Sequence, residues 1–65
     1  MQILQLINDG SIKLKKNNIF SHKLDSEILL SKALNKTREE ILINLNQDVD
    51  ENKIVQFNQL INRRS

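Results

Sequence analysis

Apolar residues recur along most of this chain at intervals of three and four positions, which is the period of an α-helix. No stretch alternates strictly between apolar and polar residues over six positions, so the pattern does not favour strands. The spacing predicts an all-α fold: a small bundle of four to five short helices around a central helix at about residues 22–35.

The segment from Leu24 to Asn35 is expected to form the central helix. Its apolar residues follow helical spacing but spread over most of the circumference; they are Leu24, Ile28, Leu29, Leu30, Ala33 and Leu34. A surface helix needs an apolar face of only about 100°, so this helix is expected to contact neighbours on several sides. Asp25 and Glu27 fall in its first turn, where carboxylates complement the helix dipole. Ser21 is the candidate N-cap, and Asn35 is a suitable C-terminal residue.

The first helix is expected to run from Ile3 to about Asn17. Its apolar face consists of Ile3, Leu4, Leu6, Ile7 and Leu14, and Gly10 lies on the same face. Because glycine inside a helix costs about 1 kcal/mol relative to alanine, it needs a compensating reason. Either another helix crosses closely at Gly10, or the helix breaks there and Ser11 caps a second short helix. After the helix, Ile19 and Phe20 are expected to pack back against the core.

Two more helices are expected in the second half of the chain. Thr37 and Glu40 have the spacing of a capping box, followed by a short helix to about Leu45 that buries Ile41, Leu42 and Leu45 and partly covers Ile43. The last helix is expected from Glu51 to about Arg63, with Asp50 as N-cap and Val49 and Ile54 as a hydrophobic staple. Its stripe consists of Ile54, Phe57, Leu60 and Ile61, with Val55 at the edge.

Length and composition limit the classes of protein that fit. With 65 residues the chain forms one domain at most, and it has no cysteine for disulfides or thiolate metal sites. No apolar run approaches the ~20 residues of a membrane span, and Met1 does not open a signal peptide. We therefore expect a soluble, unexported, cytoplasmic protein without a membrane or metal partner. The net charge of +2 predicts no particular partner.

A search for catalytic chemistry finds no candidate. One glycine cannot build a dinucleotide or phosphate loop. The paired carboxylates all lie near expected helix starts, where capping explains them, and a calcium loop is missing. His22 is expected to be a solvated residue, and Arg63–Arg64 could form an ion pair with Asp25 or Glu27. We expect no catalytic, cofactor-binding or metal-binding residue in this chain.

Three segments together resemble a known family. They are Leu24-Asp25-Ser26-Glu27-Ile28-Leu29-Leu30, Asn35-Lys36-Thr37-Arg38 and Phe57-Asn58-Gln59-Leu60-Ile61-Asn62-Arg63-Arg64. The chain resembles the N-terminal helical domain of the bacterial peptide chain release factor glutamine methyltransferases, the HemK/PrmC family. Ser26 stands where that family usually has alanine and Asn35 where it has glycine; asparagine is the second choice for a left-handed cap.

The resemblance implies that residues 1–65 are a substrate-recognition domain and that this fragment alone is not an enzyme. The parent protein would be an S-adenosylmethionine-dependent methyltransferase that N5-methylates the glutamine of the Gly-Gly-Gln loop of class-I peptide chain release factors. Its glycine-rich cofactor loop and Asn-Pro-Pro-Tyr motif would lie in a C-terminal methyltransferase domain outside this chain. The partners would be the release factor and that catalytic domain, and the fragment itself would hold no cofactor.

Two alternatives from other classes stay open. A free-standing basic nucleic-acid-binding domain would use Lys13, Lys15, Lys16, Lys23 and Arg63–Arg64, provided that folding brings them onto one face. A general helical protein-interaction module, which could be dimeric, would show an exposed apolar patch.

Overall fold

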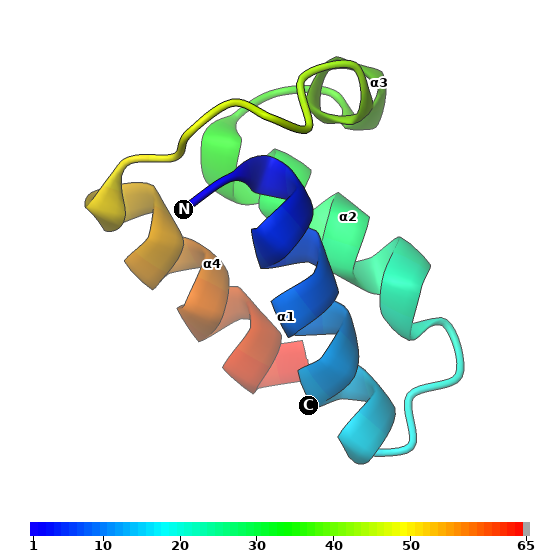
Figure 1. Ribbon diagram of the computed structural model, residues 1–65. Helices are drawn as coiled ribbons and strands as arrows, with labels where there is room; N and C mark the ends of the chain where they lie inside the picture. Colours follow the sequence, from blue (N-terminus) through cyan, green and yellow to red (C-terminus); the bar gives the residue numbers. More distant parts are fainter. Residues whose placement is uncertain (65) are drawn as a thin grey trace.

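The computed structural model describes residues 1–64, which form four α-helices and contain no strand. The helices are α1 (Ile3–Lys16), α2 (His22–Leu34), α3 (Arg38–Leu42) and α4 (Glu51–Arg64). Figure 1 shows α2 running in the opposite direction to α1 and α4, with α3 beyond the C-terminal end of α2 and the connection after α3 crossing to the start of α4. The spacing of apolar residues therefore predicts the all-α class correctly, and α1 is one unbroken helix.

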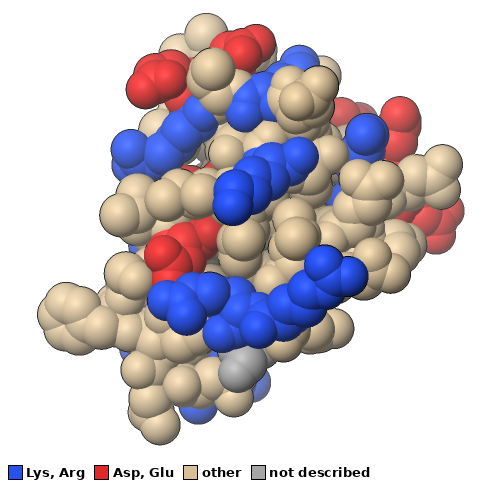
Figure 2. Space-filling view, turned by 180° about the vertical axis from the view of Figure 1, so that it is seen from behind, with Lys and Arg blue, Asp and Glu red and all other residues tan. Residues whose placement is uncertain are grey.

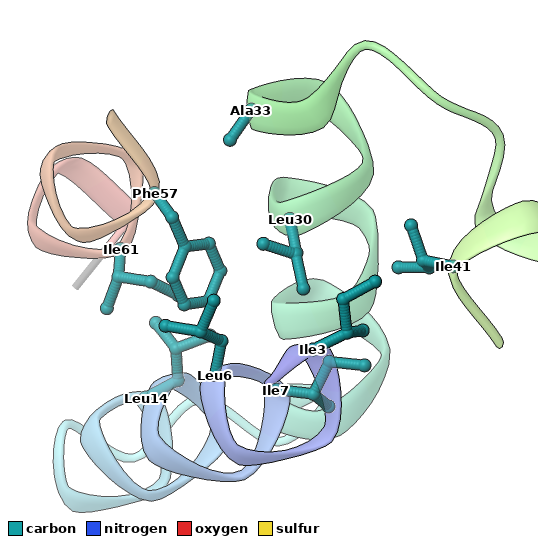
Figure 3. Close-up of a cluster of buried hydrophobic side chains, with 9 residues drawn as sticks. All are labelled: Ile3, Leu6, Ile7, Leu14, Leu30, Ala33, Ile41, Phe57 and Ile61. Carbon is teal, nitrogen blue, oxygen red and sulfur yellow. The ribbon is translucent and has the colours of Figure 1, made fainter. Parts of the chain in front are cut away.

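All four helices contribute to one hydrophobic core (Figure 3). Its buried members are Ile3, Leu6, Ile7, Leu14, Leu30, Ala33, Ile41, Phe57 and Ile61. Fully burying one Leu, Ile or Phe side chain stabilises the fold by about 1.5–3 kcal/mol. With no disulfide in the chain, this cluster is the main source of its stability.

Gly10 explains how closely the helices approach one another. A Cβ atom at this position would lie 2.6 Å from Ser26 Oγ of α2, 2.7 Å from Phe57 Cζ of α4 and 3.0 Å from Ile61 Cδ1 of α4. Such distances are shorter than van der Waals contact, so only glycine fits without movement of its neighbours. Of the two explanations left open by the sequence, close approach is the correct one, and two helices approach rather than one.

The central position of α2 is confirmed, with one correction. The helix contacts α1, α3 and α4, and its residues Ser26, Leu30 and Ala33 are buried. Ser26 satisfies its buried hydroxyl by donating a hydrogen bond of 2.8 Å to the backbone carbonyl of Ile7. Leu24 and Ile28, however, are exposed, because three neighbours cover only part of the circumference.

The connection between α3 and α4 packs against the beginning of α1. The N–H groups of Ile3 and Leu4, which have no partner within α1, donate to the carbonyls of Gln47 and Leu45, each at 3.0 Å. In return, the N–H of Val49 donates to the carbonyl of Met1 at 2.9 Å. The start of a helix leaves four backbone N–H groups without a partner inside the helix. Here the connection supplies acceptors for two of them, and no side-chain cap is formed.

Several apolar residues lie elsewhere than expected. Ile19 packs against the core, but the next residue, Phe20, is 100% exposed. Asn18 adopts a left-handed backbone conformation (φ 64°) just before them, and consecutive residues of the following turn cannot both point inward. Leu4 is also exposed, because Ile3, Leu6 and Ile7 occupy the inward positions of that part of α1.

The third helix is shorter than expected and buries less. It ends at Leu42 rather than near Leu45, and Leu42 and Ile43 are exposed, the latter by 81%. Successive helical residues point about 100° apart, so only Ile41 of this apolar run reaches the core. Leu45 is half-buried against the core from the following connection.

Helix termini follow the sequence in most places. Thr37 and Glu40 form the expected capping box, and Asn35 takes the left-handed conformation (φ 54°) after α2. Val49 and Ile54 both pack against the core at the start of α4. Ser21 precedes α2, but its side chain donates to Asp25 Oδ2 instead of accepting from the helix backbone.

Candidate interaction surface

Two ion pairs hold α3 and α4 against α2. Arg64, in the last turn of α4, donates from Nε to Asp25 Oδ2 at 3.0 Å, and its Nη2 lies 3.0 Å from the same oxygen. Arg38, the first residue of α3, donates from Nε to Glu27 Oε1 at 2.7 Å. The pairing of Arg64 with Asp25 is one of those expected from the sequence, whereas Glu27 pairs with a residue that the sequence does not single out.

The two pairs differ in their exposure to solvent. The side chains of Asp25 and Arg64 are 18% and 51% exposed, so water screens much of their attraction. Glu27 is only 8% exposed, against 46% for Arg38. The carboxylate of Glu27 therefore depends on Arg38 to compensate for its lost hydration. Besides its place in the first turn of α2, it links α2 to α3.

The capping box of α3 lowers the pKa of one carboxyl group, that of Glu40. The backbone N–H of Thr37 donates to Glu40 Oε1 at 3.0 Å, and this bond lowers the pKa of the Glu40 carboxyl below its usual value of 4.5. The Thr37 hydroxyl and the positive charge of Lys36 lower the pKa further. This shift follows from the capping geometry of an exposed helix start.

His22 has a partner that the sequence does not suggest. Its Nδ1 lies 2.6 Å from Ser11 Oγ, and the pair is partly buried between α1 and α2. The histidine expected from the sequence to be solvated is thus partly buried and has a side-chain partner. Nucleophilic catalysis by such a pair requires a third group that orients the histidine, and within residues 1–64 no carboxylate bonds to it. The geometry fits a tie between two helices.

Four of the basic residues that could mark a nucleic-acid site lie in three different surroundings. Lys13 and Lys16 line a hollow between α1 and α4. Lys15 lines another hollow, which it shares with Phe20 and His22. Arg64 is at the contact of α4 with α2, where Asp25 pairs with it. These four cations therefore do not line one common hollow.

One group of basic and apolar residues does share a surface, which we call the α2–α4 face. It consists of Ile28, Leu29, Lys32 and Arg64, which line one hollow together with Asp25, and of Lys36, which lines an adjoining hollow with Lys32. Figure 2 views the molecule from behind and shows several Lys and Arg side chains across this surface, with one acidic group among them and other Asp and Glu side chains at the top and right edges. Sequence reasoning misses this face because Lys32 and Arg64 lie far apart in the chain.

Metal sites and membrane spans are not found in the described part of the chain. Among residues 1–64, no three His, Cys, Asp or Glu side chains gather in a way that could hold a metal ion. Over the same residues, none of the helices has both the length and the apolar character required to cross a bilayer.

Comparison with known proteins identifies the family. The model of the PrmC N-terminal domain matches residues 5–65, which is nearly the whole chain. The chain belongs to the PrmC N-terminal domain family. The resemblance of its three sequence segments to HemK/PrmC proteins is thereby confirmed, and the bundle is the helical N-terminal domain of a methyltransferase family.

Relatives of this PrmC N-terminal domain are much longer proteins. The chain is 42% identical over 62 residues to a "Bifunctional methyltransferase" of Rickettsia conorii, and 40% and 39% identical over 62 residues to proteins of that name from Rickettsia felis and Rickettsia typhi. Each match covers 95% of this chain but only 12% of the relative. No solved structure matches the chain.

Proposed function

We propose that this chain is the substrate-recognition domain of a protein-(glutamine-N5) methyltransferase whose substrate is a class-I peptide chain release factor. In this proposal the domain holds the release factor, and a C-terminal methyltransferase domain of the parent protein binds S-adenosylmethionine and methylates the glutamine of the Gly-Gly-Gln loop. The observation behind it is the match of residues 5–65 to the PrmC N-terminal domain.

The chemistry of the described residues supports a binding role without catalysis. The inward-facing positions of the bundle are filled by apolar side chains, and the ion pairs join one helix to another. Catalysis needs a nucleophile, base or oxyanion site that a substrate can reach. We infer that this chain contributes no catalytic or cofactor-binding residue and that the reaction takes place wholly in the following domain, in the cytoplasm.

Binding and methyl transfer can be tested separately. The purified 65-residue chain should bind a class-I release factor, and the same affinity is expected for a release factor whose Gly-Gly-Gln glutamine is replaced by alanine. Incubation of the chain with the release factor and S-adenosylmethionine should transfer no methyl group. The proposal fails if the chain does not bind either release factor.

A further inference from the structure

One surface of the domain combines positive charge with apolar area. In the hollow of the α2–α4 face, Ile28 and Leu29 lie beside Lys32 and Arg64. Lys32 forms no ion pair within residues 1–64, and Lys36 extends the positive charge beyond the end of α2.

The acidic groups on this face are already engaged by the fold. Asp25 accepts from Arg64 and from Ser21, and Glu40, beside Lys36, accepts from the backbone of Thr37. Asp25 is neutralised by its ion pair with Arg64, whereas Glu40 keeps its negative charge and attracts Lys36. Lys32, which forms no ion pair within residues 1–64, therefore carries the positive charge most available to a partner.

The chemistry of this face favours a protein partner over a nucleic acid. Proteins that hold single strands stack bases on aromatic side chains, and the two phenylalanines of the chain lie elsewhere: Phe57 is buried, and Phe20 lines the hollow with Lys15 and His22. An apolar centre with a charged rim is instead the usual composition of a protein–protein interface.

We propose that the α2–α4 face docks an acidic surface of the release factor, with carboxylates of the partner against Lys32 and Lys36 and apolar side chains against Ile28 and Leu29. This inference rests on the proposed function, and it adds which face of the domain makes the contact and what chemistry the partner presents. Charges at the rim of an interface mainly set the association rate and its dependence on salt, so binding is expected to weaken as salt is added.

The test compares the loss of positive charge at two different places on the surface of the domain. In one variant, Lys32→Glu is combined with Lys36→Gln; in its matched control, Lys15→Glu is combined with Lys16→Gln. Both variants lose three units of positive charge; the first removes one cation from the last turn of α2, and the control removes two from the last turn of α1. A second pair, Ile28→Ala and Ile12→Ala, removes an exposed apolar side chain on α2 or on α1.

Titration of each isotope-labelled chain with the release factor, followed by NMR, measures the dissociation constant and the residues that respond. The Lys32/Lys36 variant should bind at least about tenfold more weakly, Ile28→Ala should bind several-fold more weakly, and both controls should bind as the unmodified chain does. Amide shifts in the unmodified chain should concentrate on residues 28–36. Unchanged amide spectra of the free variants, apart from the substituted sites, show that each remains folded.

Each other outcome has a distinct meaning. If the unmodified chain binds and the Lys32/Lys36 variant binds equally well, the proposed face is wrong while the proposed function stands. If the Lys15/Lys16 control loses as much affinity for the release factor, the overall positive charge of the domain, and not this face, accounts for the loss, and the proposed face is wrong. Tighter binding to an RNA oligonucleotide than to the release factor would overturn the choice of a protein partner. If the unmodified chain does not bind the release factor, both the proposed function and this inference fail.

Discussion

At the residue scale, Gly10 is the position where the packing of the helices is most restrictive. Replacing it with alanine should favour the helix by up to about 1 kcal/mol. The added Cβ, however, would meet Phe57 Cζ at 2.7 Å and Ser26 Oγ at 2.6 Å, in a part of the core where neither residue is exposed to solvent. Overpacking a core costs about 1–3 kcal/mol.

We therefore expect Gly10→Ala to lower the free energy of unfolding by about 0–2 kcal/mol in urea denaturation, the net of these two effects. Asn8→Ala is the control, because Asn8 is exposed on the same helix and alanine there changes helix propensity alone. A Gly10→Ala variant that gains the full helix-propensity stabilisation of about 1 kcal/mol would contradict the close approach of α2 and α4.

Glu27 and Arg38 show how burial changes the value of an ion pair. Arg38→Ala leaves the nearly buried Glu27 carboxylate without its partner, which should cost about 1–3 kcal/mol. Arg64→Ala breaks the more exposed pair with Asp25 and should cost about 0–1 kcal/mol. Thermal unfolding of the two variants measures the difference. Adding Glu27→Gln to Arg38→Ala should recover part of the loss, since it removes the uncompensated charge; no recovery would show that Arg38 acts through packing.

At the scale of the element, the capping box makes the stability of α3 depend on pH. The folded-state pKa of Glu40 lies below its usual value of 4.5, so the ionised carboxylate stabilises the folded chain above that value. This contribution is lost as the pH falls through the lowered folded-state pKa. In Glu40→Gln the amide can still accept from Thr37 N–H, but it carries no charge.

The native chain should therefore be more stable than Glu40→Gln at neutral pH, by an amount that stays constant down to about pH 5.5 and shrinks below about pH 4.5. Urea denaturation at a series of pH values gives the difference directly. A difference that is independent of pH from 3 to 7 would mean that the carboxylate charge does not stabilise the cap.

Three consecutive residues of α2 test how it lies in the bundle. Leu30 is fully buried, Leu29 is half-buried and Ile28 is exposed. Leu30→Ala should destabilise the chain by about 2–5 kcal/mol, Leu29→Ala by less, and Ile28→Ala by the least, about 1 kcal/mol. Equal losses at all three positions would contradict the orientation of α2, and denaturation monitored by circular dichroism distinguishes these outcomes.

At the scale of the whole molecule, the sequence predicts helices better than it predicts surfaces. Helical spacing locates the four helices and most of the core, because those features depend on neighbours within one or two turns. It does not locate the pairing of Glu27 with Arg38 or of Ser11 with His22, which depends on how two helices align. It also places Phe20 against the core and Ile43 under partial cover, although both are exposed, since an apolar residue in a sequence carries no information about whether a neighbour exists to cover it.

The α2–α4 face lies beyond sequence reasoning for the same reason. Lys32 and Arg64 are 32 positions apart in the sequence and belong to different helices, yet they line one hollow. The charges that do cluster in the sequence, Lys13, Lys15 and Lys16, are divided by the fold between two hollows. Adjacency in sequence is thus a poor guide to which charges a partner meets together.

The distribution of exposed apolar side chains predicts the oligomeric state. Those with the largest exposure are Phe20 in the α1–α2 connection, Ile43 after α3, Ile12 on α1 and Val55 on α4. They come from different elements, and Ile12 and Phe20 line separate hollows. Single exposed apolar residues are common on monomeric proteins, whereas interfaces between subunits use contiguous patches. We therefore expect a monomer of 7.6 kDa in sedimentation equilibrium across the micromolar range. Phe20→Ser and Ile43→Ser should leave the chain monomeric. If the native chain is instead a dimer that either substitution dissociates, the substituted residue belongs to a self-association surface. That result would favour the general interaction module over a monomeric recognition domain.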